Sequence, residues 1–232
     1  DVTAEKGLRR SRGTFHSLVN HKLRTPLAAA LGSLQLLERR RGAGDPGLQT
    51  LSRSLRRLAG EVRDVLEYTS ALGLRPSGET FPLEDLPELL ERVRLRLGLP
   101  RPLEIRAEGI RGLLPLSREA LETLFAELLE NAVKFHPRRD PRLELEVRLE
   151  AERAHLSLRD DGIPLSPEQA ARAFHPYFQV EERFTGEVEG MGLGLSLVEV
   201  LVLGAGGRCG LGNRPDRSGV QILLDLPLLG SG

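Results

Sequence analysis

The sequence predicts an α+β protein: an antiparallel helical hairpin that forms a dimeric four-helix bundle, followed by an α/β sandwich. Three observations indicate this fold class. Apolar residues recur at steps of three and four through most of the first 72 residues, a Pro- and Gly-rich segment follows, and the remaining chain mixes helical and strand-like periods. We therefore expect a hairpin domain over residues 1–73, a linker over 74–82 and a second domain over 83–230.

The hairpin is expected to consist of helices over residues 8–40 and 48–72, because the sequence RGAGDPG at 41–47 interrupts the helical pattern. The apolar seams are formed by Leu23, Leu27, Ala30, Leu34 and Leu37 in the first helix and by Leu48, Leu51, Leu55, Leu58, Val62, Val65, Thr69 and Leu72 in the second. Such a heptad-like seam packs against other helices. One hairpin cannot cover both seams, so we expect two copies of the chain to associate as a four-helix bundle.

The second domain is expected to place its helices on one face of a largely antiparallel sheet. The pattern predicts helices over 84–97, 117–135 and 193–203, and strands over 103–107, 142–150, 153–162 and 219–228. Ser117, followed by Glu119, is a suitable N-cap for the second of these helices. Cys209 lies in a further stretch that favours a strand.

Composition limits the classes of function. The formal net charge is zero, with a modest basic excess in the first 72 residues, and no basic stripe indicates nucleic-acid binding. Cys209 is the only cysteine, which excludes an intrachain disulfide and makes a reducing cytoplasm the expected location. No apolar run reaches the roughly 20 residues that span a bilayer. The chain begins with Asp1, so we expect it to be part of a longer protein.

His21 lies about 200° around the predicted first helix from the seam residue Leu23, and should therefore face solvent. Thr25 lies on the same face one turn later, and Pro26 removes a backbone donor beside the pair. A neutral imidazole is a usable nucleophile toward phosphorus. An isolated exposed histidine is more often an ordinary surface residue, so this pattern alone leaves both readings open.

The second pattern is ELLENAVKFHP at 127–137, in which Glu127, Asn131 and Lys134 fall on one helical stripe. A carboxylate, an amide and an ammonium in a row can hold Mg²⁺ and contact phosphate oxygens. The same residues also fit the plain polar face of an amphipathic helix.

Two further segments have the composition of a ligand site. In LRDDGIP, Asp160 ends a strand and Gly162 opens a turn, so the carboxylate can accept a hydrogen bond from an exocyclic amine such as that of adenine. In EGMGLGL, Gly190, Gly192 and Gly194 precede an apolar helix, and backbone N–H groups there can bind phosphates. Taken alone, LRDDGIP also fits an ordinary Asp-Gly turn, and EGMGLGL also fits a glycine-rich loop that binds no ligand.

Taken together and in this order, the segments resemble the transmitter region of a sensor histidine kinase of two-component signalling. The resemblance covers nearly the whole chain: NHKLRTPL is similar to the phospho-acceptor box, ELLENAVKF to the asparagine box, DDG to the first glycine box, FHPYFQVEERF to the phenylalanine segment and lid, and GMGLGL to the second glycine box. The start, DVTAEK, resembles the exit of a PAS sensor domain, which would lie upstream and outside this chain.

The resemblance implies an ATP-dependent protein-histidine kinase that acts as a homodimer. His21 would accept the γ-phosphoryl group and pass it to an Asp of a response regulator, and Thr25 would orient water for regulator dephosphorylation. The nucleotide-binding residues implied are Glu127, Asn131, Lys134, Asp160, Gly162, Arg183, Gly190, Gly192 and Gly194, with Mg²⁺ on Asn131 and Glu127.

The sequence departs from the family pattern at several positions. Lys22 stands where relatives usually have the carboxylate that takes the imidazole proton, which an ammonium cannot do. Pro164 replaces the second glycine of the first glycine box, and Met191 replaces a residue that often carries a hydroxyl. We expect a slow autokinase. The alternatives are a degenerate member acting mainly as a phosphatase or allosteric scaffold, and a dimerisation module without catalysis.

Overall fold

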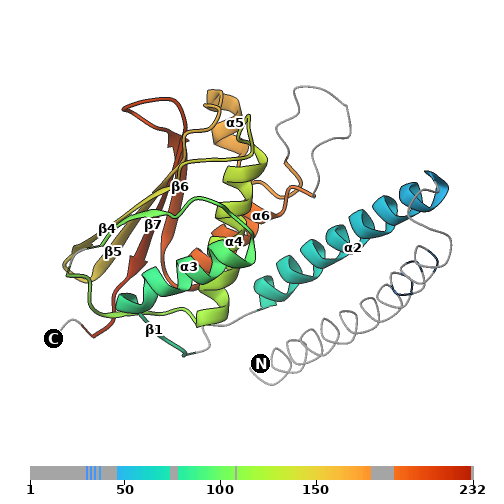
Figure 1. Ribbon diagram of the computed structural model, residues 1–232. Helices are drawn as coiled ribbons and strands as arrows, with labels where there is room; N and C mark the ends of the chain where they lie inside the picture. Colours follow the sequence, from blue (N-terminus) through green and yellow to red (C-terminus); the bar gives the residue numbers. More distant parts are fainter. Residues whose placement is uncertain are drawn as a thin grey trace, which may run out of the picture. The chain divides into compact units, whose positions relative to one another are not determined.

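The computed structural model describes residues 46–73, 78–107, 109–178 and 191–230, together with residues 30, 32, 34 and 37. The described residues form two compact units, one containing helix α2 and the other containing every strand (Figure 1). In chain order the second unit contains β1 (Phe81–Pro82), η1 (Leu83–Asp85), α3 (Leu86–Arg96), β2 (Glu104–Arg106), β3 (Leu113–Leu114), α4 (Arg118–Lys134), β4 (Glu144–Glu150), β5 (Arg153–Arg159), α5 (Pro167–Arg172), α6 (Gly194–Gly204), β6 (Arg208–Asn213) and β7 (Val220–Pro227). None of the described helices is long and apolar enough to span a membrane.

Helix α2 spans Pro46–Gly73 and confirms the helix predicted over 48–72. Its first residue is proline, which the first turn tolerates because the N–H at that position has no intrahelical acceptor. Two residues of the predicted seam, Leu51 and Leu58, remain 47% and 48% exposed, whereas Leu66, which lies outside that seam, is buried. Most of the helix predicted over 8–40 lies outside the described residues, although residues 30, 32, 34 and 37 are helical.

The main sheet has five strands in the order β2-β4-β5-β7-β6. The β2–β4 pair is parallel and the other three pairs are antiparallel, which confirms the largely antiparallel sheet expected from the sequence. A tight hairpin joins β4 to β5, with Ala151 in the turn at a φ of 50°. A separate short pair is formed by β1 and β3, so part of the segment predicted as a linker pairs with the second unit.

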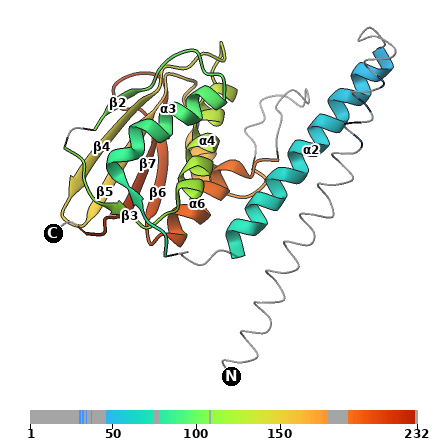
Figure 2. The same ribbon diagram turned by 60° about the horizontal axis from the view of Figure 1, so that its bottom comes forward.

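Helices α3, α4 and α6 lie together on one face of this sheet (Figure 2). The strand sequences explain why, because their side chains alternate between the two faces. In β5, Ala154, Leu156 and Leu158 are buried under the helices, while the residues between them are partly exposed on the opposite face. The core consists mainly of leucine, valine and alanine with Phe81 and Phe125, as the scarcity of aromatic residues requires.

Several elements of the second unit differ from the sequence prediction, among them β1, β3 and α5, which the pattern does not predict. Helix α5 begins with a capping box, in which Ser166 Oγ accepts a hydrogen bond from the backbone N–H of Gln169 and the Gln169 side chain accepts one from the backbone N–H of Ser166. Strand β6 was expected only as a strand-favouring stretch around Cys209, and it forms the edge of the sheet beside β7. Both elements flank the loop that follows Asp160.

Candidate functional site

Helix α4 carries three of the predicted site residues, Glu127, Asn131 and Lys134. Ser117 caps its first turn, accepting a hydrogen bond from the backbone N–H of Ala120 at 3.1 Å, as the sequence predicted. One side of the helix is fully buried, through Leu121, Leu124, Phe125, Leu128 and Leu129. This anchoring leaves the opposite stripe, with Glu127, Asn131 and Lys134, partly exposed and fixed in direction.

The start of α6 lies directly against this stripe. A Cβ added at Gly194 would overlap Glu127 Oε2 and would stand 3.5 Å from Asn131 Nδ2. The structure therefore brings together two segments that are more than 60 residues apart in the sequence. It also explains the glycine, because a larger residue at position 194 would displace the Glu127 carboxylate.

Asn131 carries an unused hydrogen-bond donor. Its Nδ2 atom is buried and has no hydrogen-bond partner in the part of the chain that the structure describes. Such a donor is costly to leave unpaired, at about 1–3 kcal/mol. A buried amide beside a carboxylate and the first turn of a helix is suited to an anionic ligand that brings its own acceptor oxygens.

Lys134 is the last residue of α4, about one turn beyond Asn131. Its Nζ lies 5.4 Å from the centroid of the Phe135 ring, close enough for a cation–π contact. The ammonium therefore lies at the end of the polar stripe, as the sequence predicted.

Asp160 follows the last residue of β5 and is held by backbone groups. Its Oδ1 accepts hydrogen bonds from the N–H of Gly162 at 2.7 Å and of Val220 at 3.2 Å. Within the described residues, Oδ2 has no protein partner. Burial raises the pKa of Asp160 above its usual value, the N–H groups of Gly162 and Val220 oppose the rise, Asp161 adds to it and Arg214 reduces it.

Gly162 is buried against this carboxylate. A Cβ there would stand 2.9 Å from Asp160 Oδ1, which is too close for a side chain without movement of its neighbours. This close approach gives a steric reason for a glycine at position 162.

The turn after Gly162 contains Pro164 in place of the second glycine expected from the family pattern. The next residue, Leu165, is clamped to β6 by Asn213: the Leu165 N–H donates to Asn213 Oδ1 at 2.7 Å, and Asn213 Nδ2 donates to Leu165 O at 2.8 Å. These paired bonds secure the turn although Pro164 has no N–H to contribute.

Several predicted site residues lie outside the described residues, namely His21, Lys22, Thr25, Arg183 and Gly190. Their roles stay predictions. Gly192 is described and has a φ of +69°, a backbone conformation that L-residues rarely adopt. The glycine at this position thus has a conformational reason in addition to its predicted ligand role.

His136 has a structural role beside the loop that carries Asp160 and Asp161. Its Nδ1 accepts hydrogen bonds from the N–H of Arg138 and of Asp140, and its Nε2 lies 3.5 Å from Asp161 Oδ1. Burial raises the pKa of the Cys209 thiol to about 11, which disfavours the nucleophilic thiolate form.

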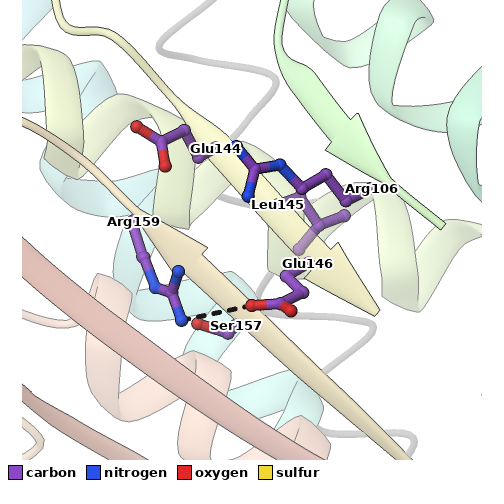
Figure 3. A pocket seen from close by; sticks show the side chains of 6 residues that line it. All are labelled: Arg106, Glu144, Leu145, Glu146, Ser157 and Arg159. Atoms are coloured by element: carbon purple, nitrogen blue, oxygen red, sulfur yellow. Dashed lines mark hydrogen bonds and ion pairs between the residues drawn. The ribbon is translucent and has the colours of Figure 1, made fainter. Parts of the chain in front are cut away.

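The sheet face away from the helices carries a shallow hollow of a different kind. Figure 3 shows the side chains that line it: Arg106, Glu144, Leu145, Glu146, Ser157 and Arg159. Arg159 Nη2 contacts Glu146 Oε2 at 3.2 Å, whereas Glu144 pairs with Arg214 and Arg217, which lie outside the hollow. The hollow is thus lined in part by ion-paired side chains and is separate from the polar stripe of α4.

The described geometry therefore favours one class of ligand. It combines a buried amide and a carboxylate at the start of α6 with a second, buried carboxylate at the end of β5. These groups suit a phosphate–cation pair at one end and a nitrogen base with an exocyclic amine at the other.

The comparisons with known proteins agree with this chemistry. Residues 117–230 match the family described as histidine kinase-, DNA gyrase B- and HSP90-like ATPase, and residues 11–72 match the His Kinase A (phospho-acceptor) domain. The order of these two domains, together with the relatives below, shows that the chain belongs to the sensor histidine kinases.

Among relatives, the chain is 32% identical over 231 residues to the sensor protein kinase CarS of Pseudomonas aeruginosa, covering 98% of this chain and 49% of CarS. It is 27% identical over 239 residues to the sensor histidine kinase RcsC of Escherichia coli, covering 95% of this chain and 24% of RcsC. Among solved structures it resembles full-length ShkA in complex with AMPPNP, with a TM-score of 0.72 and 25% identity over 94% of this chain and 46% of ShkA. The chain therefore spans half or less of the length of each of these proteins.

Proposed function

We propose that this chain binds Mg-ATP in its second unit and transfers the γ-phosphoryl group to His21, from which it passes to an aspartate of a response regulator. The observation that carries the proposal is the meeting of Glu127, Asn131 and Gly194, which unites the asparagine box and the second glycine box in one place. The AMPPNP complex of the similar protein ShkA supports a nucleotide as the ligand.

The adenine end of the site is Asp160. Because Gly162 and Val220 occupy Oδ1, the remaining oxygen is available to accept a hydrogen bond from the exocyclic amine of adenine. A base with a carbonyl in that position would present a second acceptor to the carboxylate. The proposed site therefore selects adenine over guanine.

The phosphate end combines Asn131 with the glycine loop before α6. The buried Nδ2 of Asn131 would donate to a phosphate oxygen, and the N–H groups around Gly192 and Gly194 would do the same. Lys134 and Arg183 are proposed to add positive charge toward the phosphates.

Glu127 and Asn131 fit a magnesium ion, because a carboxylate and an amide oxygen are ligands that Mg²⁺ prefers. When bound, such an ion would supply positive charge that offsets the negative charge of the phosphates. Glu127 stands in contact with the α6 start that the phosphates would approach. The protein's own contribution is to hold these two side chains on the rigid, buried helix α4.

The transfer step requires a neutral imidazole at His21. A ring nitrogen attacks the γ-phosphorus, the bond from that phosphorus to the bridging oxygen breaks, ADP leaves, and the ring proton passes to solvent. The phosphoryl group then moves to a carboxylate of the receiver domain. Lys22 cannot accept the proton, so proton transfer falls to water and the step is slow.

We further propose that the working form is a homodimer held through the seam of α2. Leu51 and Leu58 are about half exposed on this seam although they sit at heptad positions. In the longer protein, an upstream sensor domain of the PAS type would control the bundle, and Thr25 would assist dephosphorylation of the regulator.

One experiment tests the proposal. The chain is incubated with γ-³²P-labelled ATP and Mg²⁺, and we expect label that is acid-labile, stable to alkali and absent from His21→Gln. ATP binding without such label would indicate the degenerate form of the family. A chain that binds no ATP would overturn the proposal.

A further inference from the structure

The loop that carries Asp160 is supported from behind by residues 213–220, the β6–β7 turn. Asn213 clamps the backbone of Leu165, and Ser218 Oγ donates to the carbonyl oxygen of Gly162 at 3.0 Å. Backbone bonds between Asp160 and Val220 complete the attachment, with Asp160 N–H donating to Val220 O at 3.0 Å. The position of the proposed adenine-binding carboxylate therefore depends on a turn more than 50 residues away in the sequence.

Arg214 lies at the centre of this turn and is the only charged residue that is buried among the described residues. Its guanidinium donates to the carbonyl oxygen of Asp160 at 3.3 Å, to Glu144 at 3.3 Å and to Asp216 at 2.9 Å. One planar group thus links three separate segments: the end of β5, the start of β4 and the turn itself.

Gly219 makes this arrangement possible. It has a φ of +134°, and a Cβ at this position would overlap the carbonyl oxygen of Asp160 and stand 3.0 Å from Arg214 Cδ. The Arg214 N–H also donates to Gly219 O at 3.0 Å. The turn can approach Asp160 closely, with the arginine packed behind it, only because residue 219 has no side chain.

A buried ion pair is a poor way to gain stability, because its desolvation cost offsets much of the attraction. A buried arginine at this position therefore calls for a role beyond packing. Its charge lies behind a carboxylate whose pKa burial raises, and Arg214 lowers that pKa whereas Asp161 raises it. Glu144 from β4 and Asp216 from the turn face Arg214, Arg217 also pairs with Glu144, and His136 faces Asp161 from the end of α4.

We propose that Arg214 is a positioning residue for adenine recognition: it holds the main chain of Asp160 in place through its bond to the Asp160 carbonyl oxygen. The proposal rests on the proposed function, since it assigns Arg214 to the same nucleotide site. Arg214 contacts no ligand atom in this account and acts only through Asp160.

The test is ATP binding by Arg214→Met in the full 232-residue chain, measured by titration calorimetry with Mg-ATP from pH 5 to pH 9. At pH 8 we expect the affinity to fall about tenfold, because a buried charge-assisted bond to Asp160 is lost. Ionised Asp160 is needed to accept the adenine amine, so affinity declines as pH falls through its pKa. Without Arg214 that decline begins at a higher pH.

Two further variants separate positioning from general stability. Arg153→Met removes an arginine that pairs with Asp225 at 2.5 Å, at the other end of β5 from Asp160. It is expected to lower the melting temperature without changing the pH profile of ATP binding. Arg214→Lys keeps the positive charge but loses the planar guanidinium, which donates to three partners at once. We therefore expect the affinity for ATP to fall about threefold at pH 8 and the pH profile of binding to stay unchanged.

If wild type binds ATP while Arg214→Met has the wild-type affinity and pH profile, the inference is wrong and the proposed function stands. If Arg214→Met does not fold, Arg214→Lys decides: wild-type affinity in that variant also overturns the inference. Failure of the wild-type chain to bind ATP removes the proposed function and the inference together.

Discussion

Asp160 is a carboxylate that the fold keeps partly buried, and this has opposite effects on stability and on ligand binding. Its pKa is raised from the usual 3.8, mainly by burial. The folded chain therefore binds a proton at this site more readily than the unfolded chain does. This contribution to stability is present at low pH and is lost as pH rises through the folded pKa.

We predict that Asp160→Asn weakens Mg-ATP binding at pH 8 at least tenfold, about the loss of one strong hydrogen bond. The amide keeps an oxygen for the N–H groups of Gly162 and Val220 but presents a donor to the adenine amine. In the absence of nucleotide, the melting temperature should rise by about 2 °C, because a buried charge has been removed. Calorimetry and thermal unfolding measure the two effects.

A fall in melting temperature together with the affinity would contradict this explanation and assign Asp160 a mainly structural role. Asp140→Asn is a suitable control. Asp140 is also held by a partner, Arg101 at 2.7 Å, but its pKa is lowered and its side chain is 37% exposed. That substitution should leave ATP affinity unchanged.

Substitution of Lys22 should raise an activity, whereas substitution of Asp160 should lower one. The activity is the rate at which His21 is phosphorylated. Replacing Lys22 with glutamate places a carboxylate next to His21 that can accept the imidazole proton. General acid–base assistance is worth about 10²–10⁴-fold, so we expect phospho-His21 to form at least tenfold faster in Lys22→Glu. The initial rate of labelling from γ-³²P-labelled ATP is the measurement.

Lys22→Gln is the matched control, since it removes the positive charge without supplying a base. It should remain close to wild type in rate. Equal rates in wild type and Lys22→Glu would show that proton removal does not limit the reaction.

At the scale of the elements, the proposed phosphate end of the site depends on the start of α6, because this start lies against α4. Gly194 and Gly204 are the first and last residues of the same helix, but they differ in surroundings. A Cβ at Gly194 would meet Glu127 Oε2, whereas a Cβ at Gly204 would meet nothing within 4 Å. The two positions form a natural pair for substitution.

We predict that Gly194→Ala displaces the Glu127 carboxylate and weakens Mg-ATP binding about tenfold. The obstructed atom is the end of a flexible side chain, so the melting temperature should change little. Gly204→Ala should keep wild-type affinity and gain up to about 0.5–1 kcal/mol in stability, because alanine favours the helical state. Titration calorimetry and denaturant unfolding of both variants provide the measurements.

A similar affinity in the two glycine variants would contradict the assignment of the α6 start to the phosphate end of the site. Repeating the titration with ADP in the absence of Mg²⁺ shows how much of the affinity loss in Gly194→Ala depends on the cation. Under those conditions the loss in Gly194→Ala should shrink, because Glu127 then has no ion to bind.

At the scale of the whole molecule, the two units differ in how completely one chain buries their apolar side chains. The second unit buries its own core, from Phe81 to Leu228, within one chain. The first unit leaves Leu51 and Leu58 about half exposed on α2, which is unusual for seam positions. Association of two chains would bury this surface and complete a four-helix bundle.

We predict that Leu58→Glu converts the dimer to a monomer at micromolar concentration, because it places a charge in the expected seam. Leu95→Glu is the control: Leu95 lies on α3 and is 62% exposed, but it belongs to no seam. Light scattering coupled to size-exclusion chromatography gives the mass of each variant. A dimer that survives Leu58→Glu would move the interface away from this part of α2.

Local patterns in the sequence were sufficient for most of the helices and strands. The N-cap at Ser117, the threes and fours of α2, and the alternation in β4 and β5 each depend on residues close together in the chain. Short-range physics governs these features, so they can be predicted without knowledge of the fold. Local patterns alone left the roles of Glu127, Asn131, Asp160 and the glycines open, and only the resemblance to the sensor histidine kinases joined them as one predicted site.

Only the tertiary structure decided which groups meet. The sequence around Arg214 and Gly219 does not indicate a role beside Asp160. That role arises because β7 pairs with β5, which brings the β6–β7 turn to the end of β5. The closeness of Asn131 to Gly194, and the burial of its Nδ2 without a partner among the described residues, likewise depend on α4 packing against α6. The sequence by itself determined the elements and the residue types of the site; burial and long-range contact determined how those residues are held, because both arise only when distant segments pack together.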